Sequence, residues 1–410
     1  MSAGTALGAE PPPKTPNPAM APSPATTPAP VLLRELLALA RQRAPEVALG
    51  RAALTASRSS YAAAELAPLG NPQLEVKADH GMQGVTKDVT IDASVWLPVE
   101  LAGQKQTRGR EARDFVGMHE AMLEQARAAA TGRTVRVFGA LAVASARVKV
   151  LEDLLAVARA EADYFGQRLA AGDATERDAA LAALEAARNE ALLSESYVDI
   201  LREAGELEEL TGRALDKTPG LDPTPPAFAP KRPTAVLTQT TPSARVLEAE
   251  ARYYGSAAER FRREGYHPLA FGLTGGRGDY GEARIGGGIG WTWGLFRSNQ
   301  PERARAEAEK GRAMEELTVR REVMARRIDL LQKELVEVGK AVDIVTRSAL
   351  PAANRAVQAA VETNRAGKGD WLSVLVSRRD LSALSLRKLE LLDRSWRVLA
   401  ELVEMTGDLP

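Results

Sequence analysis

The 410-residue chain contains no cysteine, and this absence excludes disulfides, thiolate metal sites and a cysteine nucleophile within it. An excess of one charge is also missing, because 54 basic residues balance 54 acidic ones. Composition therefore does not favour nucleic acid as a partner. No run of about 18 apolar residues occurs, so no transmembrane helix is expected.

Residue patterns typical of catalysis or metal binding are missing too. The three histidines, His80, His119 and His267, have no metal-ligand spacing. No Ser-His-Asp set occurs in a strand–turn–helix context. The glycine-rich stretch 286–290 is followed by Trp-Thr-Trp rather than by a helix, so glycines beside a lumen or close strand contacts explain it better than a phosphate site. The sequence predicts no enzyme, no cofactor and no resident metal.

The chain contains an internal repeat. Residues 206–212 (Glu-Leu-Glu-Glu-Leu-Thr-Gly) return 195 positions later, as residues 401–407 (Glu-Leu-Val-Glu-Met-Thr-Gly). Gln104 is matched by Gln300, 196 positions later. Such self-similarity predicts two copies of one unit, each consisting of a helix, a β-hairpin and two long helices.

Two proline-rich stretches divide the chain. Residues 1–30 are predicted to be disordered, and within them residues 6–10 (Ala-Leu-Gly-Ala-Glu) resemble the end of a signal peptide whose basic and apolar parts are not present. Residues 217–242 are predicted to be a linker that crosses a surface. The first repeat is then expected at 31–216 and the second at 243–407.

Each repeat contains two segments that alternate between apolar and polar or small residues. The positions on the apolar face are Leu74, Val76 and Ala78, then Val89, Ile91, Ala93, Val95 and Leu97, and in the second repeat Leu269, Phe271 and Leu273, then Ile285, Gly287, Ile289, Trp291 and Trp293. This pattern is typical of transmembrane β-strands, with lipid outside and water inside, although a half-buried hairpin of a soluble sheet shows it as well. Trp291 and Trp293 are candidates for an aromatic girdle at the membrane interface, whereas Trp96 points to the other face.

Long helices follow each hairpin. Residues 104–170 contain no proline and predict a rod of roughly 100 Å at about 1.5 Å per residue. Apolar residues recur with heptad spacing over residues 314–345, which predicts coiled-coil packing. Glycine-containing reversals at 171–175 and 366–370 end the two rods. The other predicted helices span residues 31–67, with a kink at Pro45, 175–210 and 371–405.

Four strands cannot close a barrel, and an open sheet edge in lipid leaves backbone groups unpaired at a cost of several kcal/mol each. Chains must therefore pool their strands if the hairpins lie in a membrane. Barrels of about eight strands are filled by their own side chains, whereas wider barrels hold a pore. Glycine and other small residues on the inner face favour a pore, and hence a homotrimer with twelve strands.

Several short motifs support this layout. Residues 97–103 (Leu-Pro-Val-Glu-Leu-Ala-Gly) have the form Leu-Pro-x-x-x-x-Gly, and the second copy keeps only a Leu-Phe. Gly172 is followed by Asp178, and Gly367 is followed by Ser373. Both repeats end in Leu-x-x-Leu/Met-Thr-Gly. With the repeat and the strand pattern, these motifs resemble the TolC-type outer-membrane efflux proteins over nearly the whole chain after the N-terminal segment.

The resemblance implies a mainly helical protein with a membrane β-barrel. It implies a trimer with a twelve-stranded barrel in the outer membrane of a Gram-negative bacterium and a long helical tunnel in the periplasm. A periplasmic adaptor and an inner-membrane efflux transporter are the implied partners, and the transporter supplies the energy. Heavy-metal cations are a plausible cargo class, because members of this length serve in metal export. The alternative is a soluble periplasmic coiled-coil scaffold.

The resemblance also implies that polar residues just past the helix turns close the tunnel. Asp178 is the candidate in the first repeat, and Ser373 is its uncharged match in the second. Asp370, Arg168 and Arg365 lie nearby in the sequence. The competing interpretation is that these are solvated charges at helix ends, each contributing under about 1 kcal/mol.

The turns themselves are the implied adaptor contacts. They comprise Gly172 and Asp173 in the first repeat and Gly367 and Lys368 in the second.

Overall fold

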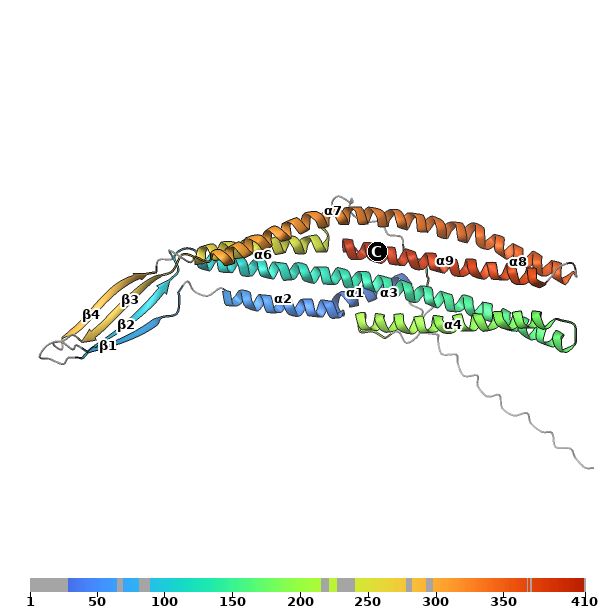
Figure 1. Ribbon diagram of the computed structural model, residues 1–410, viewed down its shortest axis with the longest axis horizontal. Helices are drawn as coiled ribbons and strands as arrows, with labels where there is room; N and C mark the ends of the chain where they lie inside the picture. Colours follow the sequence, from blue (N-terminus) through green and yellow to red (C-terminus); the bar gives the residue numbers. More distant parts are fainter. Residues whose placement is uncertain are drawn as a thin grey trace, which may run out of the picture.

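The computed structural model describes residues 29–64, 69–80, 89–214, 221–226, 240–277, 282–292, 298–366, 368 and 371–408. The molecule is long, with a four-stranded sheet at one end and two helical hairpins that reach their tips at the other end (Figure 1). None of the helices in the described part of the chain combines the length and apolarity needed to cross a bilayer.

The first repeat begins with two helices where the sequence predicts a single kinked one. Pro45 is the first residue of the second helix, a position at which its missing N–H costs nothing. The helix therefore breaks at Ala44 instead of bending. The elements of this repeat are α1 (Ala29–Arg43), α2 (Pro45–Ala64), β1 (Gln73–His80), β2 (Val89–Val99), α3 (Gln104–Ala170) and α4 (Glu176–Thr211).

In the described residues, the second repeat differs from the first in having one helix before its hairpin and a π-helical turn in its long rod. Pro351 has no N–H and its ring crowds the carbonyl of Arg347, and the helix widens into a π-helical turn just before it. The elements are α6 (Pro242–Glu264), β3 (Leu269–Arg277), β4 (Ala283–Trp291), α7 (Gln300–Ile344), the π-turn η1 (Val345–Ala349), α8 (Leu350–Arg365) and α9 (Trp371–Thr406).

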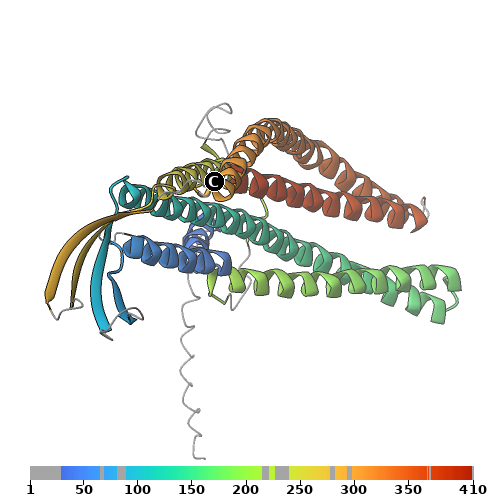
Figure 2. The same cartoon turned by 60° about the vertical axis from the view of Figure 1, so that its left-hand side comes forward.

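The helices form a layer with two successive levels along the long axis of the molecule. Near the sheet, α2, α3, α6 and α7 are neighbours, and farther away α4, α3, α9 and α7–α8 take their places (Figures 1 and 2). The long helices α3 and α7 run through both levels, while α2 and α4, and likewise α6 and α9, follow each other end to end. The helices on one border of this layer are α2 and α4, and those on the other are α7 and α8.

Close helix contacts between the two repeats require glycine. A Cβ on Gly139 of α3 would overlap the indole of Trp396 of α9, and a Cβ on Gly132 would lie 2.6 Å from that of Glu404. The Trp396 indole is buried against Phe138, with ring centroids 5.8 Å apart, and its Nε1 donates to the Pro223 carbonyl at 2.8 Å. This part of the predicted linker thus lies on the core.

The predicted heptad row on the second rod is largely confirmed. Ile328 and Leu331 are fully buried against Val398 and Leu402 of α9. Met314 is the exception and is exposed, whereas the adjacent Ala313 is fully buried.

We expect Gly139→Ala to destabilise the protein by about 1–3 kcal/mol, because the added methyl group overpacks the contact with Trp396. Gly166→Ala on the same helix is the matched control, since nothing lies within 4 Å of its Cβ position. That control should stabilise the helix by about 0.5–1 kcal/mol. Thermal unfolding of the two variants measures both effects, and equal shifts would contradict the proposed helix contact.

Candidate channel wall and helix turns

One face of the sheet is apolar and exposed. The register pairs Leu74 with Val95 and Val95 with Leu273, so the apolar positions of all four strands lie on the same face. Leu273 is 72% exposed and Ile285 is 92% exposed. Exposing large apolar side chains across a whole face is unfavourable in water, so this face requires an apolar environment.

The opposite face is polar and rich in glycine. A row across the four strands contains Lys77, Asp92, Gly276 and Arg284. A cavity of about 370 Å³ lies over this row and the next one. Charged residues on one face and lipid-compatible residues on the other are what the wall of a water-filled barrel needs.

The half-buried Trp96 explains the glycine-rich stretch at residues 286–290 of the sequence. Its indole lies across β3 and β4 on the polar face, where Cβ atoms at Gly272, Gly288 or Gly290 would meet it. Its Nε1 donates to Ser94 Oγ at 3.1 Å. The glycines therefore make room for an aromatic side chain on the inner wall, which is a close contact between strands of the two repeats.

The sheet has two free edges in the part of the chain that the structure describes. The strand order is β1-β2-β3-β4, so β1 and β4 are the outer strands. Trp291 ends β4 on the apolar face and is 61% exposed. Trp293 lies outside the described residues.

The two long helices start with the same local structure. Gly103 and Asn299, the residues before them, both have left-handed backbones, with φ of 81° and 58°. Gln104 Oε1 accepts from the Ala102 N–H at 2.9 Å, and Gln300 Oε1 accepts from the Ser298 N–H at the same distance. The repeated glutamines thus stabilise the turn that leads from each strand into its long helix.

The predicted turns also share a structure. Gly172 has φ of 80°, and the Asp173 N–H donates to the Arg168 carbonyl at 2.8 Å. The Lys368 N–H makes the equivalent bond to the Thr363 carbonyl at 3.1 Å. These are the hydrogen bonds of a Schellman motif, which satisfies the last carbonyls of a helix. Gly367 lies outside the described residues.

The candidate aperture residues of the first repeat have local partners. Thr175 is the N-cap residue of α4: its hydroxyl accepts from the Asp178 N–H at 3.2 Å and donates to the Asp178 carboxylate at 2.6 Å. The Arg168 guanidinium lies 5.7 Å from the centroid of the Tyr164 ring. The Asp178 carboxylate thus holds the capping hydroxyl and lies at the end of the helix dipole that favours negative charge.

The candidates of the second repeat are described less fully. Ser373 lies exposed near the start of α9, and its carbonyl accepts from the Ser377 hydroxyl at 2.9 Å. Arg365 ends α8, but its side chain lies outside the described residues, as does the whole of Asp370. The partners that the structure gives Asp178 and Arg168 belong to the same repeat, Thr175 and Tyr164 respectively.

Two ion-pair systems were not predicted from the sequence. Glu161 of α3 pairs with Arg378 of α9, which links the two helical hairpins near their tips, and burial lowers the pKa of Arg378. Glu161 and Arg378 lie far apart in the sequence, and 26% of all residues are charged. No local pattern therefore marks these two residues as partners.

The second system joins α3 to α4. Glu206 accepts from Arg133 Nε at 2.9 Å and from Arg136 Nη2 at 2.6 Å. Partial burial acts to raise the pKa of Glu206, but the hydrogen bond from Arg133 and the charge of Arg136 outweigh it, so the pKa lies below the ordinary value.

No set of three or more histidine or acidic side chains is placed to hold a metal ion in the described ranges. The two faces of the sheet and the long helices attached to it are therefore the features that any function has to use.

Comparisons with known proteins agree with this arrangement. No protein-family model matches the chain. The cobalt-zinc-cadmium resistance protein CzcC of Cupriavidus metallidurans is 25% identical over 347 residues, which cover 82% of this chain and 81% of CzcC. The outer-membrane channel OprN superposes with a TM-score of 0.75 at 18% identity, over 92% of this chain and 89% of its own. CusC, solved in work on folding and transmembrane channel formation, gives 0.72 at 13% identity, over 96% and 99%.

The chain therefore shares its fold, long helices joined to a four-stranded β-domain, with the outer-membrane channel OprN and with CusC. The predicted fold class, mainly helical with four β-strands per chain, is confirmed, and so is the predicted resemblance to the TolC-type outer-membrane efflux proteins, whereas the twelve-stranded trimer stays a prediction.

We expect Glu206→Gln to destabilise the protein by about 1–2 kcal/mol at neutral pH, because two charge-assisted hydrogen bonds are weakened. The native pKa of Glu206 is lowered, so its contribution is present above the unfolded-state pKa and is lost as the pH falls through the native one. The melting temperatures of wild type and variant should thus converge in acid. Glu208→Gln, on the exposed side of α4, is the control, and a pH-independent gap for Glu206→Gln would contradict this explanation.

Proposed function

We propose that this chain is the outer-membrane exit duct of a tripartite efflux system, through which solutes pass passively after an inner-membrane transporter has delivered them. The observation that carries the proposal is the sheet with one exposed apolar face and one polar face, joined directly to long helices. Catalysis has no part in this function.

A soluble coiled-coil scaffold is the rival. It would account for the heptad row between α7 and α9. It would not account for Leu74, Leu273 and Ile285, large apolar side chains left exposed on one face of the sheet. A scaffold in water would bury such residues, so the channel is favoured.

The assembly we propose is a homotrimer that closes edge to edge. The two borders of the layer end in β1 with α2 and α4, and in β4 with α7 and α8. Both borders present exposed apolar side chains, namely Leu184, Val198 and Leu201 on α4 and Val319, Val323 and Leu330 on α7. A head-to-tail contact between unlike borders closes a ring when the rotation suits, and three chains would give twelve strands.

The partners we propose are a periplasmic adaptor and an inner-membrane transporter. Gly172, Asp173, Gly367 and Lys368 are the proposed adaptor contacts, because the sequence places them between α3 and α4 and between α8 and α9, whose shared ends are farthest from the sheet (Figure 1). The relative CzcC is named as a cobalt-zinc-cadmium resistance protein, which supports heavy-metal cations as the cargo class.

The test is to express the chain behind a working signal peptide in a Gram-negative host and to separate the membranes. We expect it in the outer membrane, with a detergent-corrected mass of three 43.9 kDa chains and a measurable conductance in planar bilayers. With its cognate adaptor and transporter, it should raise tolerance to cobalt, zinc or cadmium. A soluble protein obtained despite export would return the scaffold as the better explanation.

We further propose that Asp178, Ser373, Asp370, Arg168 and Arg365 line the closed end of the duct. Asp178→Asn keeps an acceptor for the Thr175 hydroxyl and removes the charge, whereas Asp178→Ala removes both, at a cost of about 1 kcal/mol for the lost hydrogen bond. If the charge lines the duct, both variants alter conductance and cation selectivity. Glu176→Gln, in the same helical turn, is the control. A change in Asp178→Ala alone would reduce Asp178 to a capping residue.

A further inference from the structure

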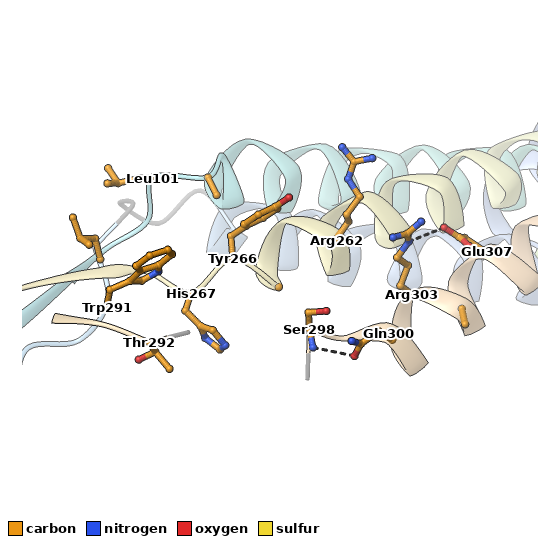
Figure 3. A pocket seen from close by; sticks show the side chains of 14 residues that line it. Leu101, Arg262, Tyr266, His267, Trp291, Thr292, Ser298, Gln300, Arg303 and Glu307 are labelled. Atoms are coloured by element: carbon orange, nitrogen blue, oxygen red, sulfur yellow. Dashed lines mark hydrogen bonds and ion pairs between the residues drawn. The ribbon is translucent and has the colours of Figure 1, made fainter. Parts of the chain in front are cut away.

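A large pocket lies where the sheet joins the helices, beside the apolar face. Its volume is about 970 Å³. Its charged and aromatic lining consists of Arg262, Tyr266, His267, Trp291, Arg303 and Glu307, which come from α6, α7 and the ends of the neighbouring strands (Figure 3).

The pocket combines cationic groups with an apolar floor. Leu269 and Trp291 line it and belong to the apolar face of the sheet. Arg262 is paired with Glu259 at 3.3 Å and Arg303 with Glu307 at 2.8 Å, each within one helix. Exposed pairs of this kind are weak, so a phosphate group can take over either guanidinium.

The internal repeat provides a comparison within the same chain. The glutamine motif at the start of the long helices occurs in both repeats, so positions 196 residues apart can be compared. None of the five corresponding positions in the first repeat carries a cation or an aromatic ring: Leu66 stands for Arg262, Gly70 for Tyr266, Asn71 for His267, Val95 for Trp291 and Thr107 for Arg303. The cationic and aromatic set is therefore an addition to one repeat and not part of the common framework.

We infer that this pocket binds the phosphodiester headgroup of a glycerophospholipid from the periplasmic leaflet. The inference rests on the proposed function, because that function places the sheet in the membrane and its helix end at the periplasmic surface. Arg262 and Arg303 bind the phosphate, and the acyl chains follow Leu269 and Trp291 along the apolar face. Tryptophan and tyrosine at headgroup level and arginine beside phosphate are the side chains that this depth of a membrane favours.

The experiment uses the full chain, purified in detergent and stripped of lipid, and measures binding by native mass spectrometry. The probes are dioleoylphosphatidylglycerol and dioleoylglycerol, which has the same acyl chains without the phosphate. We expect the phospholipid to bind at least about tenfold more tightly than dioleoylglycerol. Excess inorganic phosphate alone should not displace it, because it lacks the acyl chains.

The double variant Arg262→Gln with Arg303→Thr replaces both cations by neutral polar residues, and threonine is the first repeat's residue at the position of Arg303. It should weaken phosphatidylglycerol binding by at least about tenfold and leave dioleoylglycerol binding unchanged. Arg320→Thr is the matched control: Arg320 is 49% exposed on α7 and paired with Glu316, as Arg303 is 46% exposed and paired with Glu307. Equal binding by the double variant and the control would overturn the inference.

A neighbouring copy of the chain is the competing occupant. Since the chain has no cysteine, His267→Cys can be tested with a polar maleimide in the assembled, lipid-free protein. Reaction that phosphatidylglycerol suppresses supports a lipid site, whereas protection without lipid overturns it in favour of a subunit contact. A membrane trimer that binds no phospholipid refutes only this inference, whereas a soluble chain refutes the proposed function itself.

Discussion

The constraint on which the rest depends is that a four-stranded sheet with an apolar face and two free edges is incomplete by itself. Its backbone groups at β1 and β4 need partners, and its large apolar side chains need a medium other than water. Both needs are met when copies of the chain join edge to edge in a bilayer. The helices then inherit the symmetry of the sheet, because α3 and α7 begin directly at its end.

The interior of each protomer is complete by itself and depends on close packing between the two repeats. Gly132 and Gly139 let α9 come near α3, and Gly272 with its neighbours lets an indole lie flat on the inner wall. Trp396 lies on Gly139 and Trp96 lies on Gly272, and in both cases the indole and the glycine belong to different repeats. The two repeats are thus held together by size complementarity, with ion pairs such as Glu161 to Arg378 added at the far end.

Patterns local in the sequence were predicted well. The proline-free stretch predicted α3 with its observed bounds, Gln104–Ala170, and the alternation predicted the faces of all four strands. Features that depend on distant contacts were not predicted, such as the indole of Trp96 on β3 and β4 and the pairing of Glu161 with Arg378. The π-turn was missed although Pro351 signals it, because the heptad row on which the prediction rested ends at residue 345, where the π-turn begins.

That π-turn has a consequence for the symmetry of the tips. The second rod, from α7 to α8, has one residue fewer than α3, and its π-turn uses one residue more than an α-turn would. Two residues correspond to about 200° of helical rotation, yet α4 and α9 lie on the same side of their rods, so the second rod follows a different path to its tip. In a ring of three chains, six tips of similar sequence would then form two alternating sets, and a partner docking there would meet threefold rather than sixfold symmetry.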